Sequence, residues 1–146
     1  MTEDEWLDWT LVWTTSARVD GAADWANTQE IDTSCPWVPF GLVRQIRKSL
    51  THDEDARDFW AACIGDDELV DPLRARLTRL EPHRLVSILE VIMRDLQRVK
   101  KSMSLAAAGE WTDVFQLSNG CDCCSGAILL MQSSSDAAYL HWHRES

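Results

Sequence analysis

Residues 114–143, VFQLSNGCDCCSGAILLMQSSSDAAYLHWH, consist of three apolar runs separated by polar and glycine-bearing stretches. The runs at 114–118, 127–132 and 137–143 are bounded by turn-forming residues, and this pattern predicts three short strands. A short helix over 126–132 is the alternative, because a brief apolar run does not by itself distinguish a strand from a helix. In the strand interpretation, the stretch SNGCDCCSG is the tip of a hairpin.

This hairpin tip places three cysteines within four positions, and two histidines follow in the third run. If 137–143 is a strand, the two histidines project from the same face, two residues apart. Zinc takes four tetrahedral ligands, usually thiolates and imidazoles, while closely spaced thiolates also suit softer metals such as Cu(I). The sequence therefore suggests a metal site, with zinc as the candidate cofactor. Its candidate ligands are Cys121, Cys123, Cys124, His141 and His143.

The cysteine cluster has two other interpretations. The thiols could form a redox pair or include a reactive thiol, or they could be small packed residues of a tight loop. The spacing is not the C-x-x-C of a zinc knuckle or ribbon, so the pattern alone does not select the metal interpretation.

The segment LSNGCDCC at 117–124 resembles the C-x-C-C loop of the CobW-type GTPase metallochaperones. In that family the cysteines bind a transferred metal ion, so the resemblance implies metal binding by Cys121, Cys123 and Cys124. It covers about eight residues. The family also carries an upstream Gly-rich phosphate loop ending in Gly-Lys-Ser/Thr, which this sequence lacks, so the nucleotide chemistry does not carry over.

The middle of the chain carries helix signals. Thr51 to Glu54 reads as a capping box, Asp71-Pro72 and Pro82 as helix starts, and Gly65 and Gly109 as helix stops. Apolar residues recur between these signals at spacings of three and four. The sequence therefore predicts four helices, near 41–50, 52–64, 72–80 and 82–107.

The last of these helices has the most regular apolar pattern, with spacings of four and three. We expect this stripe to face the core of its own chain, although a seam over 85–103 could instead be a homodimer interface. The stripe consists of Leu85, Leu89, Ile92, Leu96, Val99 and Met103.

These elements predict a single domain over 1–146, of a mainly helical α+β class. A central bundle of about four helices would carry a small β or irregular C-terminal unit bearing the Cys and His residues, and an all-α fold is the alternative. The segment 6–14 could be a strand or a helix.

The composition is acidic and rich in tryptophan, with a net charge of −10 and eight tryptophans. A nucleic-acid partner is not expected, because phosphate contacts need a basic surface. Residues 1–34 hold eight acids and one arginine, whereas residues 74–101 hold eight basic and three acidic residues. An acidic surface with aromatic anchors suits docking on a basic protein partner. The candidate anchors are Trp6, Trp9 and Trp13.

Known catalytic motifs such as G-x-S-x-G and H-E-x-x-H do not occur in the sequence. The acidic clusters at 3–5, 53–55 and 66–68 are explained by helix starts or a chain end, where acids complement the helix dipole. No secretory signal or apolar run long enough to span a membrane is visible, and the five cysteines are not spaced as a disulfide framework. We therefore expect a cytoplasmic protein.

The first functional hypothesis is a non-enzymatic binding protein of the inhibitor, immunity or adaptor kind. The second is a metal-binding sensor, carrier or structural zinc protein, and the third is a thiol-dependent enzyme. The sequence does not identify the partner or the oligomeric state.

Overall fold

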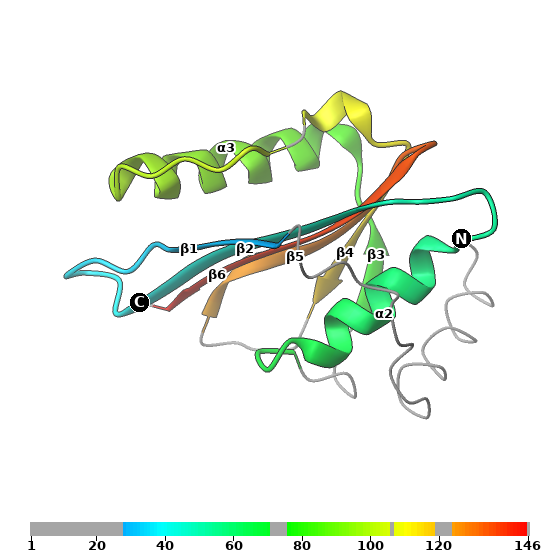
Figure 1. Cartoon of the computed structure of the whole chain (residues 1–146). Coiled ribbons are helices and arrows are strands. Elements are labelled where there is room, and N and C mark those ends of the chain that lie inside the picture. Colours follow the sequence, from blue (N-terminus) through cyan, green and yellow to red (C-terminus); the bar gives the residue numbers. More distant parts are fainter. Residues whose placement is uncertain (1–27, 71–75, 106, 119–123, 146) are drawn as a thin grey trace.

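A computed structural model of the chain describes residues 28–70, 76–105, 107–118 and 124–145. Its centre is a six-stranded sheet in which every neighbouring pair of strands is antiparallel (Figure 1). The spatial order is β1-β2-β6-β5-β4-β3. The strands are β1 (Thr28–Asp32), β2 (Phe40–Ser49), β3 (Arg76–Arg79), β4 (Asp113–Ser118), β5 (Cys124–Gln132) and β6 (Asp136–Glu145).

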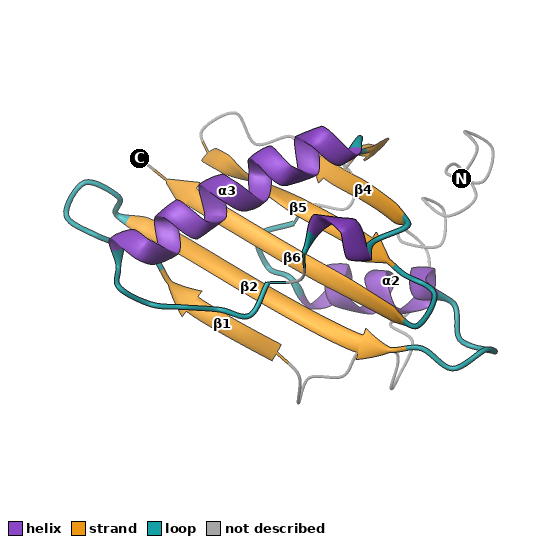
Figure 2. Ribbon diagram, turned by 90° about the horizontal axis from the view of Figure 1, so that it is seen from above, coloured by secondary structure: helices purple, strands orange, loops and turns teal. Residues whose placement is uncertain are grey.

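The central strands are apolar on both faces, because two layers cover the sheet. Helix α2 (Ala56–Asp66) lies under one face, and helix α3 (Pro82–Arg98) lies over the other, followed by the short 3-10 helix η2 (Ala108–Glu110) (Figures 1 and 2). Successive strand residues point to opposite faces, so the runs AILLM of β5 and AAYL of β6 supply both layers. All nine of these residues are buried.

The side chains separate into two clusters, one on each face of the sheet. On the α2 face, Phe59 and Trp60 pack with Ile128, Leu130 and Tyr139. The Trp60 indole also donates a hydrogen bond to the Ala138 carbonyl of β6 at 3.1 Å, which satisfies a polar group inside that layer. On the α3 face the cluster contains Leu85, Ile92, Leu96, Met103, Val43, Leu129, Met131 and Leu140.

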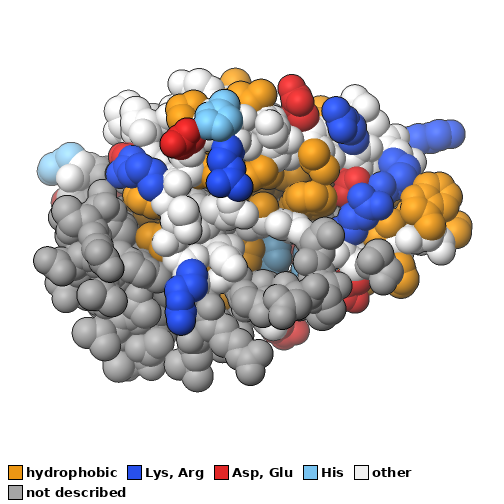
Figure 3. Space-filling model, turned by 180° about the vertical axis from the view of Figure 1, so that it is seen from behind, with side chains coloured by type: hydrophobic (Ala, Val, Ile, Leu, Met, Phe, Trp, Pro, Cys, Tyr) orange, Lys and Arg blue, Asp and Glu red, His pale blue; other side chains and the backbone are white. Residues whose placement is uncertain are grey.

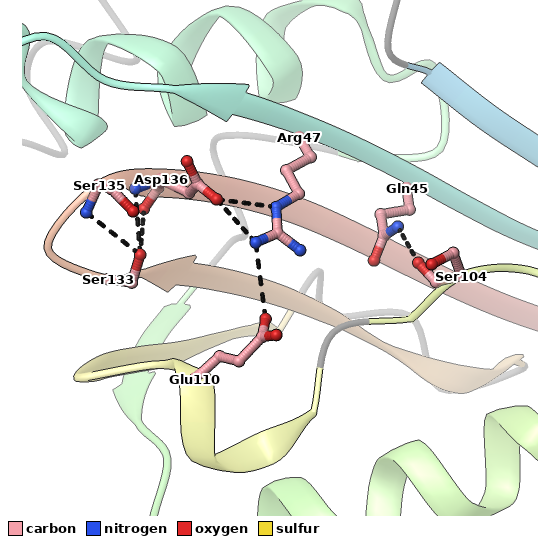
Figure 4. A network of polar contacts seen from close by, with 7 residues as sticks. All are labelled: Gln45, Arg47, Ser104, Glu110, Ser133, Ser135 and Asp136. Atoms are coloured by element: carbon pink, nitrogen blue, oxygen red, sulfur yellow. Dashed lines mark hydrogen bonds and ion pairs between the residues drawn. The ribbon is translucent and has the colours of Figure 1, made fainter.

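A polar network joins the segment after α3 to the sheet (Figure 4). Arg47 of β2 binds the carboxylates of Asp136 at 2.7 Å and Glu110 at 3.5 Å. Nearby, the Gln45 side chain donates to the Ser104 carbonyl at 2.9 Å. These contacts tie the connection between α3 and β4 to strands β2 and β6.

The helical-bundle prediction is wrong, and so is the all-α alternative, because the described residues form a sheet with one α-helix on each face. The segment 41–50 lies in β2 rather than in a helix. Its apolar residues fit a helical spacing, but in the strand they are divided between two covered faces, with Ile46 in the α2-face cluster and Val43 in the α3-face cluster. A strand buried on both sides cannot be told from a helix by periodicity alone.

The segment 72–80 contains a short edge strand, β3, which pairs with β4, and residues 71–75 lie outside the described part. The segment 52–64 does contain a helix, but it begins later. Thr51 and Glu54 make the expected capping contact, with the Thr51 N–H donating to Glu54 at 3.1 Å. The side chain that caps α2 is Asp55.

The helix predicted over 82–107 begins at Pro82 as expected but ends at Arg98, eleven residues before Gly109. Lys100 has a positive φ of 55°, which breaks the helical path before the apolar pattern stops. The three C-terminal strands are confirmed as β4, β5 and β6, but they belong to the large sheet rather than to a separate small unit.

No helix within the described residues is long and apolar enough to cross a membrane.

Gly126 of β5 should be the glycine least tolerant of a side chain. Its φ is +151°, and a Cβ there would lie 2.2 Å from the backbone oxygen of Trp142 on the neighbouring strand. We expect Gly126→Ala to lower the free energy of unfolding by on the order of 3 kcal/mol, measured by urea denaturation.

The matched control is Gly65→Ala in α2, where an added Cβ meets nothing within 4 Å. That change should stabilise the protein by about 0.5–1 kcal/mol, because alanine loses less backbone entropy in a helix. Equal effects of the two substitutions would contradict the close approach of β5 and β6 at Gly126.

Candidate functional site

The most unusual polar cluster lies on the α2 face, near the end of β6. Strand alternation places Tyr139, His141 and His143 on this face, and all three side chains are almost completely buried. The prediction that the two histidines project from one strand face is therefore confirmed. Their rings lie nearly perpendicular, with centroids 5.8 Å apart.

Asp67, directly after the end of α2, joins this cluster from the helix layer. One carboxylate oxygen, Oδ2, accepts from the Tyr139 hydroxyl at 2.8 Å and lies 2.5 Å from His141 Nδ1. The other oxygen accepts from the Leu69 N–H at 3.0 Å. The helix end thus delivers a buried carboxylate whose two oxygens are both occupied.

The pKa of Asp67 reflects opposing causes. Burial raises it, but the hydrogen bond and charge of His141, together with the Tyr139 and Leu69 hydrogen bonds, outweigh burial and lower the pKa below its usual value. Burial, with the nearby Asp67 charge, raises the pKa of Tyr139 well above its ordinary value. The pair is thus a carboxylate held by a phenol that remains protonated.

Sequence reasoning did not identify Asp67. The acidic cluster 66–68 was attributed to a helix start, whereas it lies at the C-terminal end of α2, where negative charge opposes the helix dipole. Each of the two buried or half-exposed carboxylates there has a partner on the sheet instead. Asp66 lies 3.7 Å from Arg44, and Asp67 pairs with His141. The sequence signal that could have revealed Asp67 was the presence of acidic residues just after a predicted helix, where they oppose the helix dipole.

His143 has a similar arrangement closer to the edge of the molecule. Its Nε2 lies 3.1 Å from Glu145, whose side chain is 47% exposed. The Phe40 ring packs edge-on against the His143 ring at 5.3 Å. Each histidine therefore has one ring nitrogen on a carboxylate, Asp67 for His141 and Glu145 for His143.

The predicted cysteine ligands are only partly described. Cys121 and Cys123 lie outside the described residues, so their participation stays a prediction. Cys124 begins β5, and its backbone is the register partner of Glu145. The start of β5, with Cys124, therefore lies beside the end of β6, which carries His143. Among the described residues, no three His, Cys, Asp or Glu side chains are grouped to hold a metal ion.

Two further cysteines are described. Cys35 lies half-buried in the β1–β2 turn, and Cys63 is buried in α2 beneath the sheet. Burial raises the pKa of the Cys63 thiol strongly, so this thiol stays protonated and is a poor nucleophile. Cys63 therefore gives no support to the hypothesis of a thiol-dependent enzyme.

A second candidate surface is a groove of about 350 Å³ on the outer side of α3. On the face opposite to the one shown in Figure 1, hydrophobic side chains interspersed with Lys and Arg are exposed (Figure 3). Val86 and Met93 are 43% and 39% exposed, although both are apolar. The groove is lined by Val86, Leu89, Glu90, Met93, Arg94, Gln97 and Ala108.

The predicted anchors Trp6, Trp9 and Trp13 lie outside the described residues. Trp37, in the turn between β1 and β2, is 64% exposed. The apolar stripe predicted over 85–103 mostly faces the sheet of its own chain, although Val99 and Met103 lie after the end of α3. Leu85, Ile92, Leu96 and Met103 are buried in the α3-face cluster, while Leu89 and Val99 are half-buried.

Comparisons with known proteins identify no relative. No family model matches, and neither the curated proteins nor the solved structures contain a significant match.

Asp67→Ala should lower the free energy of unfolding by about 3–5 kcal/mol, because it leaves His141 and the Tyr139 hydroxyl buried without their partner. Urea denaturation of the purified chain measures this loss. The neighbouring exposed residue gives the control, since Glu68→Ala should change stability by less than about 0.5 kcal/mol. A small effect of Asp67→Ala would show that the buried pair does not hold α2 against the sheet.

Proposed function

We propose that the protein is a non-enzymatic binding protein, of the inhibitor, immunity or adaptor kind, that binds an acidic amphipathic helix of a partner protein. The observation that carries this proposal is the apolar groove on the outer side of α3. Helix-in-groove binding is a recurrent mode of recognition, in which apolar residues of the bound helix enter a hydrophobic groove.

The shape of α3 supports this role. Its inner face is buried against the sheet through residues such as Leu85 and Ile92, yet apolar residues continue on its outer face. Val86 and Met93 are exposed two turns apart, and the half-buried Leu89 between them lines the groove while also packing against the α3-face core. Polar residues at the edges, Glu90, Arg94 and Gln97, could orient a bound helix.

The charge around the groove specifies the proposed partner. The groove is lined by one acid, Glu90, and one base, Arg94. Over α3 and the segment that follows it, the exposed bases outnumber the exposed acids by four to three: Arg84, Arg94, Lys100 and Lys101 against Glu81, Glu90 and Glu110. This small excess of basic residues is found on a chain whose net charge is −10. Such a local field favours an acidic partner segment and should accelerate its association at low ionic strength.

The proposal differs from the sequence hypothesis of a basic partner docked on the acidic N-terminal third. Trp6, Trp9 and Trp13 remain candidate anchors for a second contact. We place the protein in the cytoplasm, as the sequence predicts. A membrane or nucleic-acid partner is not part of the proposal.

The test compares affinity capture from the source cell by three forms of the full chain: the wild type, Met93→Asp and His52→Asp. Each variant adds one negative charge at an exposed position, but His52 lies in the turn before α2, outside the groove. We expect one stoichiometric protein to be captured by the wild type and by His52→Asp and lost with Met93→Asp. Its acidic amphipathic segment is then made as a peptide and titrated calorimetrically against all three forms.

Met93→Asp should weaken the binding of the peptide at least tenfold, because the new carboxylate lies in an apolar contact and repels the acidic residues of the peptide. Arg94→Glu should mainly slow association and reduce its dependence on salt. A captured protein with no acidic helix, binding that is unchanged in Met93→Asp, or no stoichiometric partner at all would overturn the proposal.

A further inference from the structure

We propose that His141 and His143 form a binding site for a divalent transition-metal ion of the zinc class. This site lies on the α2 face of the sheet and is separate from the α3 groove, so it does not depend on the proposed docking function. The proposal rests on the described side chains of β6, α2 and β2.

Strand geometry gives the pair its chelating arrangement. The two histidines are two residues apart on β6 and therefore project from the same face. A zinc ion lies about 2.0–2.1 Å from each imidazole nitrogen that binds it, so two imidazoles on one ion have centroids roughly 5 Å apart. The observed separation of the two ring centroids, 5.8 Å, is close to this value.

The hydrogen bonds of the pair are those that metal-binding histidines usually make. Such histidines typically donate the second ring N–H to a carboxylate, which fixes the tautomer and the ring orientation. Asp67 occupies Nδ1 of His141, and Glu145 occupies Nε2 of His143. Each ring therefore keeps one nitrogen that neither carboxylate uses, Nε2 of His141 and Nδ1 of His143.

The surrounding charges also favour a cation. Four carboxylates lie on this face of the sheet or at the end of α2, those of Glu30, Asp66, Asp67 and Glu145. Each of these carboxylates is paired either with one of the two histidines or with Arg44, the register partner of His141. Its guanidinium nitrogens lie 3.7 Å from both Glu30 and Asp66. The local balance is therefore negative.

The described side chains supply two imidazole ligands, and no third ligand is grouped with them. The other coordination positions would be taken by water. Imidazole with water suits zinc, cobalt and nickel.

The test titrates the metal-stripped full chain with Co²⁺ and then with Zn²⁺, following the visible absorbance of Co²⁺ and its displacement. The chain has four histidines, so the two outside the proposed site, His52 and His83, serve as internal controls. His143→Gln removes one proposed ligand, while His83→Gln removes a histidine that is 74% exposed on α3. Glu145→Gln removes only the carboxylate behind His143 and should leave the fold intact.

We expect one equivalent of Co²⁺, at least tenfold weaker binding with His143→Gln, and about tenfold weaker binding with Glu145→Gln. His83→Gln should bind like the wild type. Because a variant of a buried residue can unfold, circular dichroism is recorded for each protein. In addition, the wild-type imidazole NMR signals of His141 and His143 should be broadened first by Co²⁺.

The proposal is overturned if the wild type binds no stoichiometric metal, if folded His143→Gln binds as tightly as the wild type, or if Co²⁺ broadens the His52 or His83 signals first. None of these outcomes depends on a partner protein. Failure of the metal proposal therefore leaves the docking proposal unaffected, and failure of the docking proposal leaves the metal proposal unaffected.

Discussion

The structure depends on the double-sided burial of the central strands β5 and β6. Their apolar runs place large side chains on both faces, and no single layer of helix could cover both. The hydrophobic free energy of the sheet therefore requires α2 on one side and α3 on the other. The connection after α3 then returns the chain to the sheet, where β4 pairs with β5.

Each face also holds one buried carboxylate that anchors its helix. On the α3 face, Asp95 accepts from the Trp142 indole at 2.8 Å and from Arg98 at 3.0 Å. On the α2 face, Asp67 accepts from Tyr139 and pairs with His141. The partners of the two carboxylates alternate along β6, so one strand fixes both helices. A buried carboxylate is costly without such partners, which makes these contacts specific for the observed arrangement.

This arrangement explains why the two proposed activities lie on opposite sides of the sheet. The proposed metal ligands lie on the α2 face of β6, where both imidazoles are buried and each is hydrogen-bonded to a carboxylate. The docking proposal uses the outer side of α3, which the sheet does not need for its own burial. The hydrogen bond from the Trp142 indole to Asp95 holds the sheet-facing side of α3 against β6, the strand that carries the two histidines.

Part of this fold was predictable from the sequence. The three C-terminal strands were found because Gly, Asn, Asp and Ser clusters separate their apolar runs, and the common face of His141 and His143 followed from strand alternation. The segment 41–50 was mistaken for a helix, because burial on both faces removes the alternation that identifies a strand. Asp67 was missed because its role depends on the contact of α2 with β6, which no local pattern records. The exposed stripe of α3 was hidden within a helix that is apolar on more than one side.

The most direct test of the account is native-state hydrogen exchange of the backbone amides, followed by NMR. The account predicts that the amides of residues 128–131 and 138–141 exchange most slowly, with free energies of opening equal to that of global unfolding. Amides in α2 and α3 should exchange at equal or lower free energies, because each helix can detach from one face of an intact sheet. If the amides of α3 were the most protected and those of β5 and β6 exchanged quickly, the central claim that the two-faced sheet organises the molecule would be contradicted.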